Sequence, residues 1–254
     1  MQLLITNDDG IKSPGLLALV RAMRPLGQLA IVAPDRNWSA SGHVKTMHRP
    51  LRAYPALLED GTPALACDGA PSDCVALALL GLVPDPVDLV VSGINPSANL
   101  GHDVTYSGTV TAAMEAAIAG TQAMAVSLDV PEGLTDDIDF APAAQVAGQL
   151  ARKMLAHPLP DGVLLNVNVP YVLHDNPHLA VTRQGLRLYR DELIERSDPR
   201  GRPYYWIGGE PPSGVAEPGT DVWALSEGQV SVTPLQLDLT AHDQIDSLKG
   251  WSLA

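Results

Sequence analysis

The sequence is poor in aromatic residues, cysteines and long apolar runs, and each shortage excludes a class of protein. Only 4% of the 254 residues are aromatic and Phe140 is the single phenylalanine, so the core must consist of Leu, Val, Ile and Ala. Two cysteines, Cys67 and Cys74, are too few for a disulfide framework and lack CxxC spacing. We therefore expect reduced thiols in a cytoplasmic protein. No run of about 18 apolar residues occurs, and we expect no membrane span.

Basic residues are scarce as well. The chain has 16 Lys and Arg against 29 Asp and Glu, a net charge of −13 with neutral histidines. Because nucleic-acid backbones favour clustered Lys and Arg, we expect no stable nucleic-acid partner. A small anionic substrate remains compatible if a local site or a metal ion reverses the field. The N-terminal MQLLITNDDG has no basic or long apolar segment, so we expect no signal peptide.

Four common catalytic signatures are absent from the sequence. It contains no GxxxxGK[ST], GxGxxG, GxSxG or HExxH. These absences argue against a P-loop, a nicotinamide-dinucleotide site, a serine-esterase elbow and a zincin.

Apolar runs and helical patterns alternate along the first 170 residues. Continuous apolar strands that alternate with helices predict a mostly parallel sheet covered on both faces, which is a three-layer, Rossmann-like α/β fold. We predict strands over 2–6, 29–33, 87–92, 123–128 and 163–169, a helix that begins at Pro14, and helices over 71–82, 109–119 and 139–155.

The composition changes after Pro170. Residues 185–221 are rich in Arg, Gly, Pro, Tyr and Trp and predict a β-hairpin with loops that projects from the body. A strand is expected over 229–239 and a short helix within 240–254. We expect a single α/β domain over residues 1–254, with 185–221 and 229–254 as sub-elements.

Polar turns follow three of the predicted strands, at residues 7–10, 35–42 and 92–101. Ligands of open parallel sheets bind beyond the carboxyl ends of the strands. We therefore expect these three loops to meet at one edge of the sheet.

Asp8 and Asp9 are adjacent carboxylates at the end of the first strand. Their charges repel, and a divalent cation with oxygen ligands relieves the repulsion. Alternatively, one aspartate caps the following helix and the other is solvated. The position at a strand end, with Gly10 allowing a tight turn, favours the ligand role.

The other two loops carry further candidates. Ser39 supplies a hydroxyl ligand or is simply part of a loop, and His43 is an acid, a phosphate contact or an ordinary surface histidine. Asn95 and Asn99 offer carbonyl oxygens to Mg²⁺ or Mn²⁺, although a turn role alone would explain them.

Ser107, Gly108 and Thr109 precede the helical run VTAAMEAAIAG. Unpaired amides and the helix dipole at such a start favour an anion such as phosphate. An ordinary N-cap explains the same residues equally well.

Taken in order, these motifs resemble the survival protein SurE family of metal-dependent 5′/3′-nucleotidases. The resemblance covers nearly the whole chain. It is carried by ITNDDGIKSPG, VAPDRNWSASGH, APSDCVALAL, VVSGINPSANLGHDVTYSGTVTAAMEA, LLNVNVP and GTDVWAL followed by GQVSVTPLQLDLTAH.

The resemblance implies a phosphomonoesterase that hydrolyses nucleoside 5′- and 3′-monophosphates with one divalent metal ion, Mg²⁺ or Mn²⁺. It implies Asp8 and Asp9 as catalytic residues and a cytoplasmic homodimer or homotetramer that exchanges its C-terminal segment. The implied metal ligands are Asp8, Asp9, Ser39 and Asn95, the phosphate contacts are Asn99, Ser107, Gly108 and Thr109, and Asp238 and His242 affect activity or assembly.

The chain departs from the family pattern at three positions. Trp38 stands where a basic residue is common, Ser97 where Gly is common, and Ala70 where Thr is frequent. These departures concern substrate preference more than the type of reaction.

Three other functions compete with this interpretation. A cation-dependent nucleoside hydrolase also places aspartates after its first strand, but its DxDxxxDD arrangement is absent. A receiver-type module would be about half this length and would carry a Lys after a later strand. A structural scaffold would use the polar turns only as caps, and metal titration would distinguish it.

Overall fold

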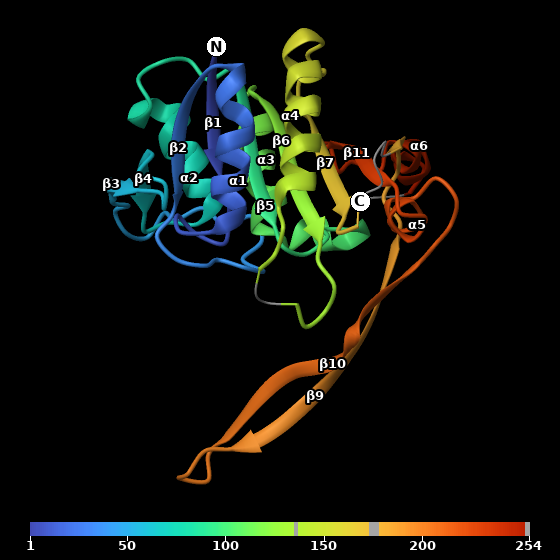
Figure 1. Cartoon of the computed structure of the whole chain (residues 1–254). Helices are drawn as coiled ribbons and strands as arrows, with labels where there is room; N and C mark the ends of the chain where they lie inside the picture. The colour runs from blue at the N-terminus through green and yellow to red at the C-terminus, as the bar shows by residue number, and fades with distance from the viewer. Residues whose placement is uncertain (135–136, 173–177, 252–254) are drawn as a thin grey trace.

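A large sheet forms the centre of the molecule (Figure 1). The computed structural model describes residues 1–134, 137–172 and 178–251. Within these ranges the strands of the large sheet are β1 (Gln2–Thr6), β2 (Gln28–Pro34), β3 (Ala53–Leu57), β4 (Pro63–Cys67), β5 (Leu89–Asn95), β6 (Gln122–Asp129), β7 (Val163–Pro170), β8 (Leu179–Val181) and β11 (Val230–Gln236).

Their order across the sheet is β3-β4-β2-β1-β5-β6-β7-β11-β8. The six strands from β4 to β7 in this order are parallel, whereas β3 pairs antiparallel with β4 and β11 antiparallel with β7. The predicted mostly parallel α/β sheet is confirmed.

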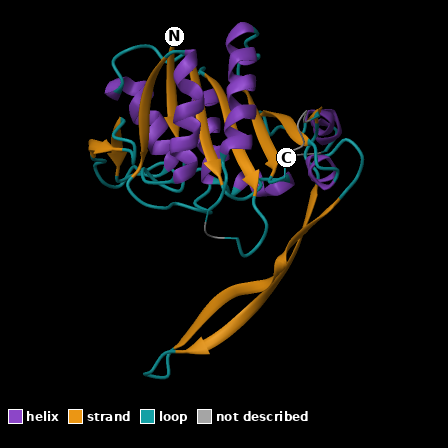
Figure 2. Cartoon of the chain, viewed as in Figure 1, coloured by secondary structure: helices purple, strands orange, loops and turns teal. Residues whose placement is uncertain are grey.

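Helices cover both faces of the sheet, which makes three layers (Figures 1 and 2). Helices α1 and α4 contact each other on one face, and α2 and α3 contact each other on the opposite face. The helices are α1 (Pro14–Met23), α2 (Pro71–Leu77), α3 (Gly108–Ile118), α4 (Ala141–Ala156), α5 (Asp221–Ser226) and α6 (His242–Lys249), with short helical turns η1 (Arg24–Leu26), η2 (Ala78–Leu82) and η3 (Gly101–Thr105).

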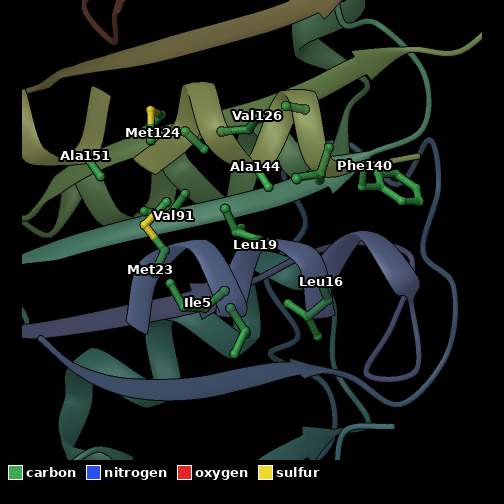
Figure 3. Packing of buried hydrophobic residues seen from close by; sticks show 14 of the residues in the cluster. Ile5, Leu16, Leu19, Met23, Val91, Met124, Val126, Phe140, Ala144 and Ala151 are labelled. Carbon is green, nitrogen blue, oxygen red and sulfur yellow. The ribbon is translucent and has the colours of Figure 1, made fainter. Parts of the chain in front are cut away.

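The continuous apolar strands divide their side chains between two cores because successive residues of a strand point to opposite faces. In β1, Leu3 and Ile5 belong to the core under α1 and α4, whereas Leu4 belongs to the core under α2 and α3. Figure 3 shows side chains of the first core, among them Ile5 of β1, Leu16 of α1, Val91 of β5 and Met124 of β6. Burial on both faces fixes the central strands and thereby the loops at their ends.

Strand β1 lies between β2 and β5, and the chain changes direction across the sheet there. It passes outward through β2 and β4 on one side of β1, then returns to β5 on the other side. The carboxyl ends of β1 and β5 therefore border a topological switch point, the usual ligand crevice of such sheets.

A long hairpin projects beyond the carboxyl edge of the sheet (Figures 1 and 2). It consists of β9 (Leu186–Ser197) and β10 (Pro203–Val215), which pair antiparallel with a register shift between Glu210 and Ser213. The hairpin predicted within 185–221 is confirmed. Helix α6 agrees with the short helix predicted within 240–254, although residues 252–254 lie outside the described residues.

Some predicted boundaries were wrong. The strand predicted over 87–92 runs instead from Leu89 to Asn95, so the predicted turn at 92–101 begins only after Asn95. The strand continues because Gly93 fits against β6, where an added Cβ would lie 2.4 Å from the Val126 carbonyl oxygen, and because Ile94 is fully buried.

The sequence analysis did not predict four elements, namely β3, β4, β8 and α5. The segments AYPAL and PALAC are rich in Ala and Pro and lack the β-branched residues typical of strands. In the described part of the chain, no helix is long and apolar enough to cross a membrane.

We expect Gly15→Ala to destabilise the protein. Gly15 lies in the first turn of α1, and an added Cβ would be 2.2 Å from the Ile94 carbonyl oxygen. Overpacking of this kind typically costs about 1–3 kcal/mol of unfolding free energy. Gly148→Ala is the control, because its nearest contact is an ordinary 3.5 Å and a helical Gly→Ala change stabilises by about 0.4–1 kcal/mol. Urea midpoints that fall equally in both variants would contradict this prediction.

Candidate functional site

The turn after β1 is closed by the side chain of Asn7. Its amide donates to the Gly10 carbonyl at 3.0 Å, and its carbonyl accepts from the Gly10 N–H at 3.2 Å. Gly10 has φ of 100°, a conformation that favours glycine. This turn holds Asp8 and Asp9 at the carboxyl edge of β1.

Asp8 is buried, with 3% of its surface exposed. The Thr109 hydroxyl donates to its Oδ1 at 2.5 Å. Burial raises the pKa of Asp8, and the hydrogen bonds from Thr109 offset part of that rise. The N-cap of α1 is Ser13. The alternative in which one aspartate caps this helix and the other is solvated is therefore wrong.

Asp9 carries a buried oxygen, Oδ2, for which the described residues supply no hydrogen-bond partner. Its Oδ1 accepts a hydrogen bond from the Asn37 amide at 3.3 Å. Burial and then the charge of Asp8 raise the pKa of Asp9 to about 7. Two adjacent carboxylates, one buried and one partly buried, with an unpartnered oxygen are the arrangement that a cation stabilises.

The loop that carries Ser39 is tied to the end of β1. The Trp38 N–H donates to the Asp8 carbonyl oxygen at 2.8 Å, and the Ser39 N–H donates to Asn37 Oδ1 at 2.8 Å. The Arg36 guanidinium carbon lies 5.0 Å from the centroid of the Trp38 ring. The departure at position 38 therefore packs against Arg36, while its backbone helps to fix the loop that carries Ser39.

Asn95 ends β5 next to β1. Its side-chain nitrogen donates to the Ser97 carbonyl oxygen at 2.5 Å, so the side-chain oxygen is the atom that could bind a cation. The contact uses the backbone of residue 97, so the departure at Ser97 does not remove it. The third departure, Ala70, begins α2, where its N–H donates to Asp73 Oδ2 at 2.9 Å.

Buried asparagines of β7 fix the loop after β5 through hydrogen bonds. Asn168 Oδ1 accepts from the Asn99 N–H at 2.7 Å, and the amides of Asn166 and Asn168 donate to the Asn99 carbonyl. The Asn99 side-chain nitrogen donates to Ser127 Oγ at 2.7 Å, so its oxygen is the atom left for a phosphate contact. Sequence reasoning missed the two asparagines of β7, although polar residues at alternate positions of VLLNVNV were a signal.

Ser107 is the N-cap of α3, since its Oγ accepts from the Val110 N–H at 3.1 Å. The Thr109 hydroxyl is engaged by Asp8, so the helix start offers an anion its backbone amides rather than that hydroxyl. A Cβ added to Gly108 would lie 2.8 Å from the Cβ of Asp8. The start of α3 is thus in direct contact with the aspartate pair.

These groups surround two neighbouring hollows. The first, about 330 Å³, is lined by residues of all three predicted loops, among them Asp8, Ser39, Asn95, Asn99 and Ser107. The second, about 600 Å³, is lined by Asp9, Lys12, Ser13, Pro14, Pro96, Asp137, Ile138 and Phe140. The three distant loops therefore meet at one edge of the sheet.

Five predicted residues do not line either hollow: Gly108 and Thr109, which adjoin Asp8, and His43, Asp238 and His242. His43 Nε2 lies 2.9 Å from Glu115 Oε2, beside Lys45, whose Nζ lies 2.9 Å from Oε1 of the same glutamate. Asp238 and His242 form an exposed pair at 2.5 Å. They follow β11, which ends beside the start of β7, so they lie at the opposite edge of the sheet from the site in the same chain.

The candidate metal ligands form a mixed donor set. Among the described residues, no group of three or more His, Cys, Asp or Glu is arranged to hold a metal ion. A cation here would be held by two carboxylates together with the hydroxyl of Ser39 and the amide oxygen of Asn95. An all-oxygen set fits Mg²⁺ or Mn²⁺ better than thiolate-bound metals.

We expect Asp9→Asn to stabilise the metal-free protein at alkaline pH. Asp9 has a folded pKa of about 7 and an unfolded pKa near its ordinary value, so the folded state binds its proton more tightly. The unfolding free energy is therefore lowered progressively as the pH rises from about 4 to about 7. The variant avoids this loss, which is about 4 kcal/mol at most. Urea unfolding in EDTA at pH 5 and pH 8 tests this, and an equal benefit at both pH values would contradict it.

The fold and these loops define a class of protein, a Rossmann-like α/β protein with a paired-aspartate site at its switch point. Comparison with known proteins identifies the family. The family model described as Survival protein SurE matches residues 3–191. The chain belongs to the SurE family.

Similar proteins match along the whole chain. The 5′-nucleotidase SurE of Chloroflexus aggregans is 51% identical over 252 residues, which cover 99% of each chain. That of Herpetosiphon aurantiacus is 52% identical and covers 98% of this chain and 97% of its own. The crystal structure of the SurE protein from Aquifex aeolicus superposes with a TM-score of 0.82 at 41% identity, covering 98% of each chain.

Proposed function

We propose that this protein is a metal-dependent 5′-nucleotidase that hydrolyses nucleoside monophosphates to nucleoside and phosphate. The names of its full-length relatives support the reaction, since both relatives above are 5′-nucleotidases. The observation that carries the proposal is the contact between Asp8 and the start of α3, which brings a cation site and an anion site together.

Each group has a distinct role in the proposed reaction. Asp8, Asp9, Ser39 and Asn95 hold the cation. The amides at the start of α3 and the side-chain oxygen of Asn99 face the phosphoryl group. When bound, a divalent cation neutralises phosphoryl charge and acidifies water.

The proton transfers belong to the protein. A water molecule attacks phosphorus in line, and the nucleoside oxygen leaves. We assign Asp9 Oδ2 to orient this water and accept its proton, because that oxygen is buried and unpartnered among the described residues. The proton then passes to the nucleoside oxygen as that oxygen leaves. Amides fixed by α3 stabilise the charge on the phosphoryl oxygens without reorganising.

The finer features of the reaction are also proposals. We propose Mg²⁺ or Mn²⁺ as the metal, activity on 3′- as well as 5′-monophosphates, a cytoplasmic location, and one domain over 1–254 with 185–221 and 229–254 as sub-elements. We propose a homodimer or homotetramer as well. Exposed apolar residues of the hairpin, such as Leu193, Trp206 and Ile207, support association with a second copy.

A phosphate-release assay tests the function. AMP and other nucleoside 5′- and 3′-monophosphates are incubated with the protein in Mn²⁺, in Mg²⁺ and in EDTA. We expect phosphate and nucleoside in the presence of metal and neither in EDTA. Release of free base instead of phosphate would establish the nucleoside hydrolase, and absence of both products would contradict a nucleotidase.

A further inference from the structure

Arg187 is the residue through which the hairpin reaches the site. It is the second residue of β9, and it lines the same hollow as Asp8, Asn95 and Ser107. Its side chain is 16% exposed, and its Nε lies 2.7 Å from Asp103 Oδ2. Neither motif reasoning nor the proposed mechanism gives this arginine a role.

The position of Arg187 is set by a buried anchor at the root of the hairpin. Asp221 is fully buried, and its two carboxylate oxygens accept the N–H groups of Gly101 at 2.8 Å and Gly185 at 2.7 Å. The Gln184 amide donates to the Gly101 carbonyl at 2.8 Å. The backbone two residues before Arg187 is therefore fastened to the loop that leads into α3.

One side chain among the described residues that line this hollow is cationic. Among its described lining residues, Asp8 and Asp103 are acidic and Arg187 is the single basic residue. Asp8 and Asp9 together offset the charge of a divalent cation, and Asp103 offsets that of Arg187, so no net positive charge is left for a phosphate dianion in a chain with a net charge of −13. Phosphate binding at this hollow would then rest on directed N–H donors.

Arg187 retains donors for that purpose. Asp103 lies against Nε, and no hydrogen bond from the terminal nitrogens occurs among the described residues. Guanidinium groups carry five N–H donors and bind phosphate oxygens in pairs. Asp103 also accepts the Tyr189 hydroxyl at 2.5 Å, so it fixes two side chains of β9 against η3.

We propose that Arg187 binds the phosphoryl group of the substrate through its terminal nitrogens, while its Nε lies against Asp103. This assignment rests on the proposed phosphomonoesterase function and extends it by making the hairpin root part of the substrate site. The alternative is a purely structural ion pair between the hairpin and η3. The two differ in what happens when Asp103 is neutralised.

Binding of inorganic phosphate to the full-length protein in Mn²⁺, measured by titration calorimetry, tests the proposal. We expect Arg187→Ala to weaken phosphate binding about 10- to 100-fold, the effect of losing a hydrogen bond to a charged group. Arg187→Lys retains the charge but not the paired geometry, so its loss is smaller. Arg190→Ala is the control, because Arg190 lies on the same strand and pairs with Glu210 away from the site. It leaves phosphate binding unchanged.

The Asp103→Asn variant distinguishes phosphate binding by Arg187 from a purely structural ion pair between Arg187 and Asp103. It weakens the ion pair but frees the guanidinium, so we expect phosphate affinity to be kept. Equal losses in Asp103→Asn and Arg187→Ala, or phosphate binding by Arg187→Ala within twofold of the wild type, would overturn the proposal. If Arg187→Ala does not fold, the comparison of Arg187→Gln with Arg187→Lys decides, because both retain an unbranched polar side chain and only Lys keeps the charge.

The same titration distinguishes this proposal from the proposed function. A wild-type protein that binds phosphate through Arg187 but releases none from nucleoside monophosphates contradicts the nucleotidase and not the arginine. A wild-type nucleotidase whose Arg187→Ala variant keeps its phosphate affinity contradicts the arginine alone.

Discussion

Asp8→Asn abolishes metal-dependent phosphate release from AMP. The substitution keeps the size of the side chain but removes one of the two charges proposed to bind the cation. It also turns the carboxylate that accepts the Thr109 hydroxyl at 2.5 Å into a neutral amide, so the link to the start of α3 loses its charged acceptor. Losing a single preorganised contact typically lowers the rate about 10²–10³-fold, and here the cation and the anion sites are affected together.

Two measurements and one control variant test this prediction. Initial rates in Mn²⁺ report the activity, and thermal unfolding with and without Mn²⁺ reports cation binding, since a ligand of the folded state raises its stability. We expect Mn²⁺ to stabilise the wild type and not the variant. Asp246→Asn is the control, because Asp246 is exposed on α6 and pairs with Lys249 of the same helix. An Asp8→Asn variant with the wild-type rate in Mn²⁺ would refute the metal assignment.

Sequence pattern predicted the sheet because its central strands are buried on both faces. Such strands form continuous apolar runs, so residues 2–6 and 163–169 stand out without any knowledge of their neighbours. The end of each apolar run predicts where a loop begins at the carboxyl edge of the sheet. The sequence alone therefore indicates Asp8 and Asn95 as candidate site residues. The short edge strands β3 and β8 carry no such run and were missed.

The parts of the site that pattern did not predict depend on long-range contacts. Asn168 holds the Asn99 backbone across 69 residues of sequence, and Arg187 reaches the loop of Asp103 from the hairpin. Neither residue belongs to a local motif that specifies its partner. The contact of the Thr109 hydroxyl with Asp8 is of the same kind, since it joins residues that are 101 positions apart in the sequence.

Gly108 lies in contact with the turn after β1 and the loop that carries Ser41, and its substitution tests whether the convergence of these loops matters. An added Cβ would lie 2.8 Å from the Cβ of Asp8, 3.1 Å from Asp8 Oδ2 and 3.2 Å from Ser41 Oγ. The first of these contacts is too short to persist, so the start of α3 and the turn after β1 must move apart.

We expect Gly108→Ala to lower the rate of phosphate release from AMP at least about 10²-fold while the protein stays folded, because small displacements of reacting groups cost about that much. Initial rates in saturating Mn²⁺ and circular dichroism measure the two effects. Gly148→Ala, the same change in a helix distant from the hollows, keeps full activity. A Gly108→Ala variant that is folded and fully active would show that the aspartates and the start of α3 tolerate separation, and the reaction would then not depend on the cation and anion sites being in contact.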